Sequence, residues 1–350
     1  MSNYEARAWE KLIAHEQSRR GSVRTRVTEK LSGALTGAAS SIDGHFRKLP
    51  GGDKIASGVD AAIRASLSGA ANAIFIPAIS SVSIDSRASR LRKRYPEVGD
   101  ASPFFILDLQ ELDKGRPRQK IAILGATASA GASVAITGAE VSTTVSGGAT
   151  AAVVAAAIAG DVAASLALLG RATAEVAVHY GFDPNEPGEE IFLMGVLSYS
   201  TAASVEGKVG ALTALSKLSQ QMMRRATWKE LEKDVLVKVI QAVFTKIGIR
   251  LTHKRLAQVV PVVGGVVSAG LSYDMLSRAV RDASHVYRAR YLAQKHGLSF
   301  DDWVSHAASA QKISPGLQHE LDEAPVDVEA EVDEAIKASL DDESGNDVGS

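Results

Sequence analysis

The most constraining feature of this chain is a long segment that is almost free of charge. Between Lys120 and Arg171 only Glu140 and Asp161 are charged, and Ala, Gly, Ser, Thr and Val supply most of the other residues. Such a segment must be buried in protein or laid against lipid. Small residues also let helix backbones approach closely in either setting. The segment therefore predicts a tightly packed helical hairpin, and it leaves open whether protein or lipid covers it.

Two charge-free runs in this segment, residues 121–139 and 141–160, are long enough to span a bilayer core of about 30 Å. Composition argues against a span, because strongly apolar residues are few and a longer window would enclose Asp161, at a cost of about 2.5–3.5 kcal/mol. A further charge-free run, 256–273, is of marginal length. We therefore favour a buried hairpin over an inserted one. For Asp161 we favour a helix cap or a hydrogen-bonded core residue over a residue that faces a partner helix or a polar spot in a cavity, and we retain it as a candidate contact for lipid or a partner.

Helical periodicity recurs along most of the chain. Aromatic residues make up only 5% of it, which favours a core of Ala, Val, Leu and Ile in packed helices. Glycines mark the expected ends of two helices, at Gly248 and Gly297. The predicted fold class is all-α, a multi-helix bundle with Ala/Gly-rich central hairpins. Apolar residues recur at helical spacing in four segments: 27–49, 55–67, 231–247 and 271–295.

Charge divides the chain into a basic body and an acidic tail. Residues 320–350 hold twelve acidic residues and one lysine, so the first 319 residues carry 38 basic and 28 acidic ones, a net charge of +10. The tail composition favours disorder, with a short acidic helix over 326–340 as the alternative. We expect a helical N-terminal region (1–118), a helical core (119–312) and the tail (313–350). The first ten residues are polar and charged, unlike a signal peptide.

A basic cluster near residue 90 is the clearest candidate binding surface. Its positive charge fits either a solvated helix face or contact with anionic lipid, where each basic residue contributes about 1 kcal/mol. Nucleic acid is not expected as a partner, because no interleaved aromatic residues or DNA-binding motif accompany the charge. Tyr95-Pro96 should end the helix. The cluster comprises Arg87, Arg90, Arg92, Lys93 and Arg94.

Motifs for catalysis, cofactors or metals do not stand out. The chain has no cysteine, its eight histidines lack ligand spacing, and neither a dinucleotide nor a phosphate-binding glycine motif occurs. We therefore predict no catalytic residue, no cofactor and no metal. Ser268 and Ser309 lie in weak matches to serine-nucleophile patterns that chance supplies readily.

The turn around Gly181 is the most individual local sequence. His179-Tyr180-Gly181-Phe182-Asp183-Pro184 closes the low-charge segment, and Glu189 and Glu190 follow where a new helix should begin. Gly181 is expected to end the preceding helix, and Asp183-Pro184 to open a turn. We retain Tyr180 and Asp183 as candidate contacts for lipid or a partner, beside the purely structural interpretation.

The order of these features resembles the bacterial EcsC family. The resemblance covers roughly residues 70–310 and leaves the acidic tail outside it. It implies a bacterial, mainly helical protein, from a family named after a component encoded beside an ABC transporter and without an agreed activity. It carries over no catalytic residue. The resemblance rests on the Gly/Ala-rich segment with Asp161, Tyr180-Gly181-Phe182-Asp183, a helix from about Glu190, Val260-Pro261-Val262-Val263-Gly264-Gly265, Ala283, Tyr287, Arg288, Arg290 and Leu292.

Together these observations predict a non-enzymatic accessory or scaffold protein at the cytoplasmic face of a bacterial membrane. Its expected partners are an anionic membrane surface and an ABC transporter. The acidic tail would then compete with lipid for the basic surface. A soluble helical carrier of a hydrophobic small molecule is the alternative, and a hydrolase or peptidase is the least favoured function.

Overall fold

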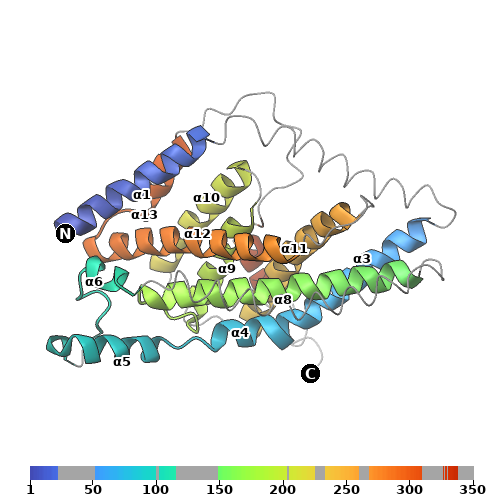
Figure 1. Ribbon diagram of the computed structural model, residues 1–350, viewed down its shortest axis with the longest axis horizontal. Helices are drawn as coiled ribbons and strands as arrows, with labels where there is room; N and C mark the ends of the chain where they lie inside the picture. The colour runs from blue at the N-terminus through green and yellow to red at the C-terminus, as the bar shows by residue number, and fades with distance from the viewer. Residues whose placement is uncertain are drawn as a thin grey trace, which may run out of the picture.

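Helices account for all the regular secondary structure in the part of the chain that the computed structural model describes, so the predicted all-α class is confirmed (Figure 1). The described residues are 1–22, 52–99, 102–115, 149–202, 205–224, 233–259, 268–309, 326, 328 and 330–337. Residues 330–337 are helical as well. The other helices are α1 (Asn3–Ser22), α3 (Gly52–Ala70), η1 (Ala71–Phe75), α4 (Ile76–Ser80), α5 (Ile84–Arg94), η2 (Pro96–Val98), α6 (Leu109–Asp113), α8 (Ala149–His179), α9 (Pro187–Thr201), α10 (Val205–Arg224), α11 (Lys233–Val259), α12 (Ser268–His296) and α13 (Phe300–Ser309).

The long helix α8 lies at the centre of the fold, packed against α3, α9, α11 and α12 (Figure 1). It comes from the second half of the low-charge segment, whereas 121–139 and the predicted helix at 27–49 lie outside the described residues. Small residues allow the close packing that the sequence predicts. A Cβ atom on Gly170 would lie 2.4 Å from the Phe75 ring. Asp161 lies half-buried in the middle of α8, so it is not a helix cap.

Among the residues that the structure describes, two helical segments could cross a membrane by length and composition alone: Ser57–Arg94, of 38 residues, and Ala155–His179, of 25. Of the most apolar part of each segment, 28% and 56% respectively is buried inside the protein. Core helices of soluble proteins pass the same test, so this property carries little weight by itself. In α8 the apolar residues serve as the protein core.

Helix α11 runs through Gly248, so the predicted helix end at this glycine is wrong. A Cβ atom on Gly248 would lie 2.6 Å from Cδ2 of Leu67, which is fully buried on α3. The glycine therefore allows two helices to approach closely instead of ending one of them. By contrast, α12 ends at His296 as predicted, and Gly297 follows with a φ of 64°.

Part of the acidic tail packs on the helical body. Val326, Val328 and Val332 are buried, and residues 330–337 are helical. The short-helix alternative therefore holds for this part of the tail, and the other tail residues lie outside the described ranges. Glu331 pairs with Lys246 of α11 rather than with the basic cluster.

Candidate functional site

Helix α5 presents most of its basic residues to solvent. The Ser83 side chain caps the helix by accepting a hydrogen bond from the Ser86 amide at 3.3 Å, and Tyr95 ends it as predicted. Ala88 and Leu91 are buried, because they face the rest of the protein. Arg90, Lys93 and Arg94 are exposed.

Arg87 and Arg92 differ from the other members of the basic cluster, because both are half-buried. The Nε atom of Arg87 is buried without a hydrogen-bond partner among the described residues, and its guanidinium lies against Gly115. Burial, assisted by Arg90 and Arg94, lowers the pKa of Arg87. Arg87 therefore contributes to how α5 sits on the protein, while Arg90, Lys93 and Arg94 form its outer charge.

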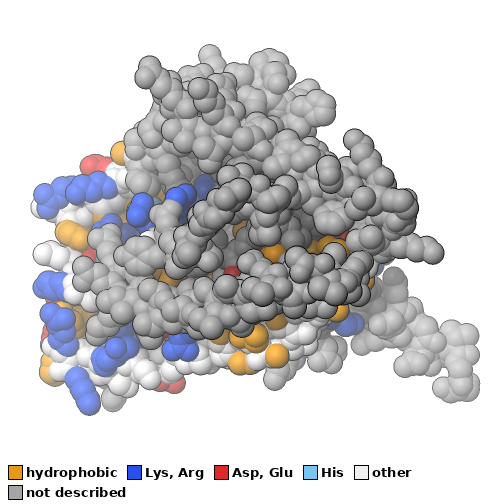
Figure 2. Space-filling model, turned by 45° about the vertical axis from the view of Figure 1, so that its right-hand side comes forward, with side chains coloured by type: hydrophobic (Ala, Val, Ile, Leu, Met, Phe, Trp, Pro, Cys, Tyr) orange, Lys and Arg blue, Asp and Glu red, His pale blue; other side chains and the backbone are white. Residues whose placement is uncertain are grey.

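Helix α5 is fastened at both ends. Before it, the Val82 carbonyl accepts a hydrogen bond from Nδ2 of Asn185 at 3.3 Å. After it, the Tyr95 hydroxyl donates to the Glu111 carboxylate. Figure 2 shows Lys and Arg side chains gathered on the left of the view, at the end of the molecule where α1 and α5 lie. The basic residues are thus held on a helix whose position on the protein is fixed at both ends.

The predicted turn after α8 is confirmed. Gly181 has a φ of 92°, and a Cβ atom there would lie 2.5 Å from the Phe104 side chain. The Asp183 carboxylate accepts hydrogen bonds from the amide and the side chain of Asn185, both at 3.0 Å. Asp183 is therefore a half-buried turn residue. Tyr180 is buried, and its hydroxyl donates to Oδ1 of Asp113 at 3.4 Å.

Asp113 joins four segments that are distant in sequence. Besides Tyr180, its carboxylate accepts a hydrogen bond from the Tyr4 hydroxyl at 2.7 Å. Arg288 of α12 forms an ion pair with the same oxygen at 2.6 Å, and the side chains of both partners are largely buried. One carboxylate thus connects α1, α6, the end of α8 and α12.

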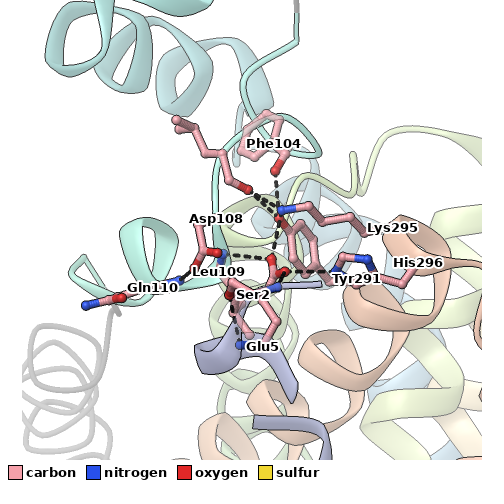
Figure 3. A network of polar contacts seen from close by, with 10 residues as sticks. Ser2, Glu5, Phe104, Asp108, Leu109, Gln110, Tyr291, Lys295 and His296 are labelled. Atoms are coloured by element: carbon pink, nitrogen blue, oxygen red, sulfur yellow. Dashed lines mark hydrogen bonds and ion pairs between the residues drawn. The ribbon is translucent and has the colours of Figure 1, made fainter. Parts of the chain in front are cut away.

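Glu5 is the centre of a second buried network (Figure 3). Lys295 and His296 of α12 approach its two carboxylate oxygens at 2.8 and 2.9 Å, and the amides of Ser2 and Leu109 each donate at 3.1 Å. Only 2% of Glu5 is exposed. Burial alone would raise the pKa of Glu5, but the hydrogen bonds from Lys295, Ser2 and Leu109 outweigh it and lower the pKa to about 2. The carboxylate therefore stays charged.

Tyr291 closes this network from the side of the protein core. Its hydroxyl lies 2.9 Å from the carbonyl oxygens of both Phe104 and Leu107, and its ring stacks on Phe105. Burial, assisted by nearby acidic groups including Glu5, raises the pKa of Tyr291, so the phenol remains protonated. The 102–108 segment is thereby bound to α12.

A third cluster surrounds Arg290. Its guanidinium forms a bidentate ion pair with the Glu189 carboxylate, in which one N–O distance is 2.6 Å. The same group lies 4.0 Å from the centroid of the Phe192 ring and 4.4 Å from that of Phe182. Tyr287 packs against both rings, and burial raises its pKa. Arg290 thus fixes the start of α9 and the turn after α8 to α12.

Residues 110–292 match the EcsC protein family. This range is just over half of the 350-residue chain. The chain belongs to the EcsC family. The prediction from the sequence is therefore confirmed, over a shorter range than the roughly 70–310 that the sequence features covered.

This EcsC chain is also similar to the uncharacterized protein YdbA of Bacillus subtilis (strain 168). The two are 27% identical over 138 residues, which is 38% of this chain and 47% of the relative. The chain therefore spans about half the length of the curated relative that it matches. No solved structure matches the chain.

The structure brings some of the predicted site residues of this EcsC chain together and separates others. Tyr180 and Phe182 lie beside Tyr287, Arg288 and Arg290, so two parts of the resemblance that are distant in sequence converge. The outer residues of α5 form a separate surface.

Several buried charges of this EcsC chain were not predicted to be functional. For the segment with Arg288, Arg290 and Lys295 the sequence predicts a helix but no partners, and the structure pairs each of the three with a carboxylate inside the protein. Glu189 lies in the first turn of α9 as predicted, yet its partner was missed. Only the place of Arg288 and Arg290 in the family pattern gave a signal, and nothing in the sequence singled out Glu5.

The three clusters in this EcsC chain hold helices together and leave few free reactive groups. Each of the described carboxylates at their centres is paired with a cation, and the tyrosines Tyr287 and Tyr291 stay protonated. Within the described ranges, no group of three or more His, Asp or Glu side chains is arranged to hold a metal ion. The side chains of Ser268 and Ser309 lie outside the described residues. The exposed cations of α5 lie apart from these three clusters.

Proposed function

We propose that this protein is a non-enzymatic accessory or scaffold protein that binds the anionic, cytoplasmic face of a bacterial membrane through α5. The observation that carries the proposal is the exposure of Arg90, Lys93 and Arg94 on one short helix that is fastened at both ends. Basic side chains on a fixed helix can approach an anionic surface together. At about 1 kcal/mol each, the three contribute about 3 kcal/mol to such binding.

Two exposed apolar side chains support contact between this end of the protein and the membrane. Met1 and Ile106 are each 58% exposed. They directly adjoin Ser2 and Leu107, which both belong to the polar contacts around Glu5 and Lys295. The N-terminus and α6, which these residues adjoin in sequence, lie at the end of the molecule where α1 and α5 are found (Figure 1). Apolar residues beside basic ones suit the boundary between headgroups and acyl chains.

A membrane transporter fits this proposal as a protein partner. The resemblance to a family named after a component encoded beside an ABC transporter supports that choice. A protein held at the bilayer by α5 would leave its remaining faces available for such a partner. The lipid contact can be tested first, because it makes a quantitative prediction.

Flotation with anionic vesicles tests the lipid contact. We expect the full chain to float with phosphatidylglycerol-containing vesicles and to detach from them at high salt. It should not bind neutral vesicles. The variant Arg90→Ala/Lys93→Ala/Arg94→Ala should bind roughly 100-fold more weakly. The control variant is Arg64→Ala/Lys217→Ala/Lys238→Ala, which removes the same charge from exposed positions on α3, α10 and α11.

The control variant should keep nearly all of the binding, because its positions are on other helices. Equal loss in both triple variants would show that net charge, not α5, governs the interaction. Absence of flotation for the wild-type chain at low salt would refute the lipid contact altogether.

A further inference from the structure

A narrow groove between α9 and α10 is filled by the acidic tail. Val326 and Val328 are buried in it, and both are less than 4% exposed. Close approach of the two helices forms its floor, because Gly195 of α9 lies so near Leu215 of α10 that a Cβ atom would be 2.6 Å away. The remaining cavity admits no more than about one water molecule. The groove is lined by Gly195, Ser198, Ala211, Ala214, Leu215 and Leu218.

Polar contacts add specificity to this apolar fit. The buried hydroxyl of Ser198 donates to the backbone carbonyl of Val326 at 3.3 Å. Glu331, which is 8% exposed, forms an ion pair with Lys246 of α11, and Val332 beside it is buried. The tail is therefore held through alternate side chains, one backbone carbonyl and one charge. Proteins commonly recognise peptides through this combination.

The groove lies within the range that matches the EcsC family, whereas the tail segment that fills it does not. Helices α9 and α10 and Lys246 all lie within the matched range 110–292, whereas the tail lies beyond it. The groove thus lies in the matched range, and the segment that fills it lies outside that range. In sequence, residues 310–325 join the tail segment to the end of α13.

We propose that this groove is a peptide-binding site for acidic segments of the pattern Val-x-Val-x-x-Glu-Val, and that residues 326–332 occupy it in cis. The two leading valines enter the groove, Ser198 binds the backbone, and Lys246 recognises the glutamate. A protein partner with the same pattern would bind by displacing the tail. This site is independent of α5 and of the lipid contact.

A labelled peptide of residues 322–338 tests the proposal. The full chain with Val326→Asp/Val328→Asp, called the emptied chain below, should have an empty groove. In the wild type the groove is filled by the tail, whose short connection to the body gives the tail an effective concentration on the order of 1 mM. Fluorescence anisotropy should therefore show at least tenfold tighter peptide binding to the variant than to the wild type. No binding to this variant, once circular dichroism shows it to be folded, would overturn the proposal.

Charge reversal then tests the recognition of Glu331. The peptide with Glu331→Lys should bind the emptied chain about fivefold more weakly. Adding Lys246→Glu to the emptied chain should restore binding of the Glu331→Lys peptide. The control is Lys238→Glu, an exposed change two turns away on α11 that should restore nothing. Equal recovery with both changes would refute recognition by Lys246.

A second measurement covers the case in which the emptied chain does not fold. In the otherwise wild-type chain, Lys246→Glu and Glu331→Lys should each speed hydrogen exchange of residues 326–337 by about fivefold, and the double variant should return it towards the wild-type rate. Unchanged exchange in the single variants, or additive acceleration in the double variant, would contradict docking through this pair.

Discussion

Glu5 offers the sharpest test of how the N-terminal helix is held. Replacing it by glutamine keeps its size but removes the negative charge that pairs with Lys295 and contacts His296. The side chains of Lys295 and His296 are each only 15% exposed, so the variant leaves the Lys295 charge without its partner in a poorly solvated site. Breaking a buried pair from one side costs about 3–5 kcal/mol.

The pKa of Glu5 gives a separate measure of the same interaction. A value of about 2 in the folded protein, against the ordinary 4.5, corresponds to about 3 kcal/mol of stability at neutral pH. Because the folded value lies below the unfolded one, this stability is complete above pH 4.5 and is lost as the pH falls towards 2. About 2 of the 3 kcal/mol should be gone by pH 3.

Urea unfolding followed by tryptophan fluorescence and circular dichroism measures both effects. At pH 7, Glu5→Gln should lower the free energy of unfolding by about 3 kcal/mol, and the gap to the wild type should narrow steadily below pH 4.5. Glu10→Gln, an exposed change on the same helix, is the matched control and should stay within about 0.5 kcal/mol of the wild type. The reasoning is refuted if Glu5→Gln costs under 1 kcal/mol, or if its gap to the wild type does not depend on pH.

Two further substitutions test packing and geometry. Gly248→Ala should destabilise the protein by about 1–3 kcal/mol, because its methyl group would meet Leu67, whereas Gly69→Ala has open space and should be neutral or stabilising in thermal unfolding. Arg290→Lys should cost about 2 kcal/mol, because lysine cannot keep both the bidentate pair and the two ring contacts. Arg281→Lys, exposed on the same helix, is its control; equal melting temperatures for the two lysine variants would contradict this explanation.

Much of the fold could be predicted because helices carry local signals. Spacing of apolar residues located α3 and α12, and Gly181 and Gly297 marked helix ends through positive φ angles. The prediction at Gly248 was wrong because the residue type alone does not distinguish a glycine that ends a helix from one that lets a neighbouring helix approach closely. Only the position of Leu67 on another helix distinguishes them.

The candidate site was less predictable, because its contacts join residues that are far apart in sequence. Arg290 and Glu189 are 101 positions apart, and Lys295 and Glu5 are 290 apart. Periodicity shows which face of a helix a residue occupies, but it does not show what packs against that face. The ion pairs of the charged residues on α12 could therefore not be predicted from the sequence. The α5 cluster was identified because its charge lies in one short segment.

The alanine-rich surface of α8 affects the balance between entropy and burial. Alanine has no side-chain rotamers to lose on folding, so ordering this helix costs less entropy than ordering one lined with leucine or methionine. Each methyl group also buries little apolar area and contributes little stabilisation by itself. A helix of this kind depends on being surrounded, as α8 is by α3, α9, α11 and α12. Removing any one of these neighbours would therefore weaken the attachment of all the others.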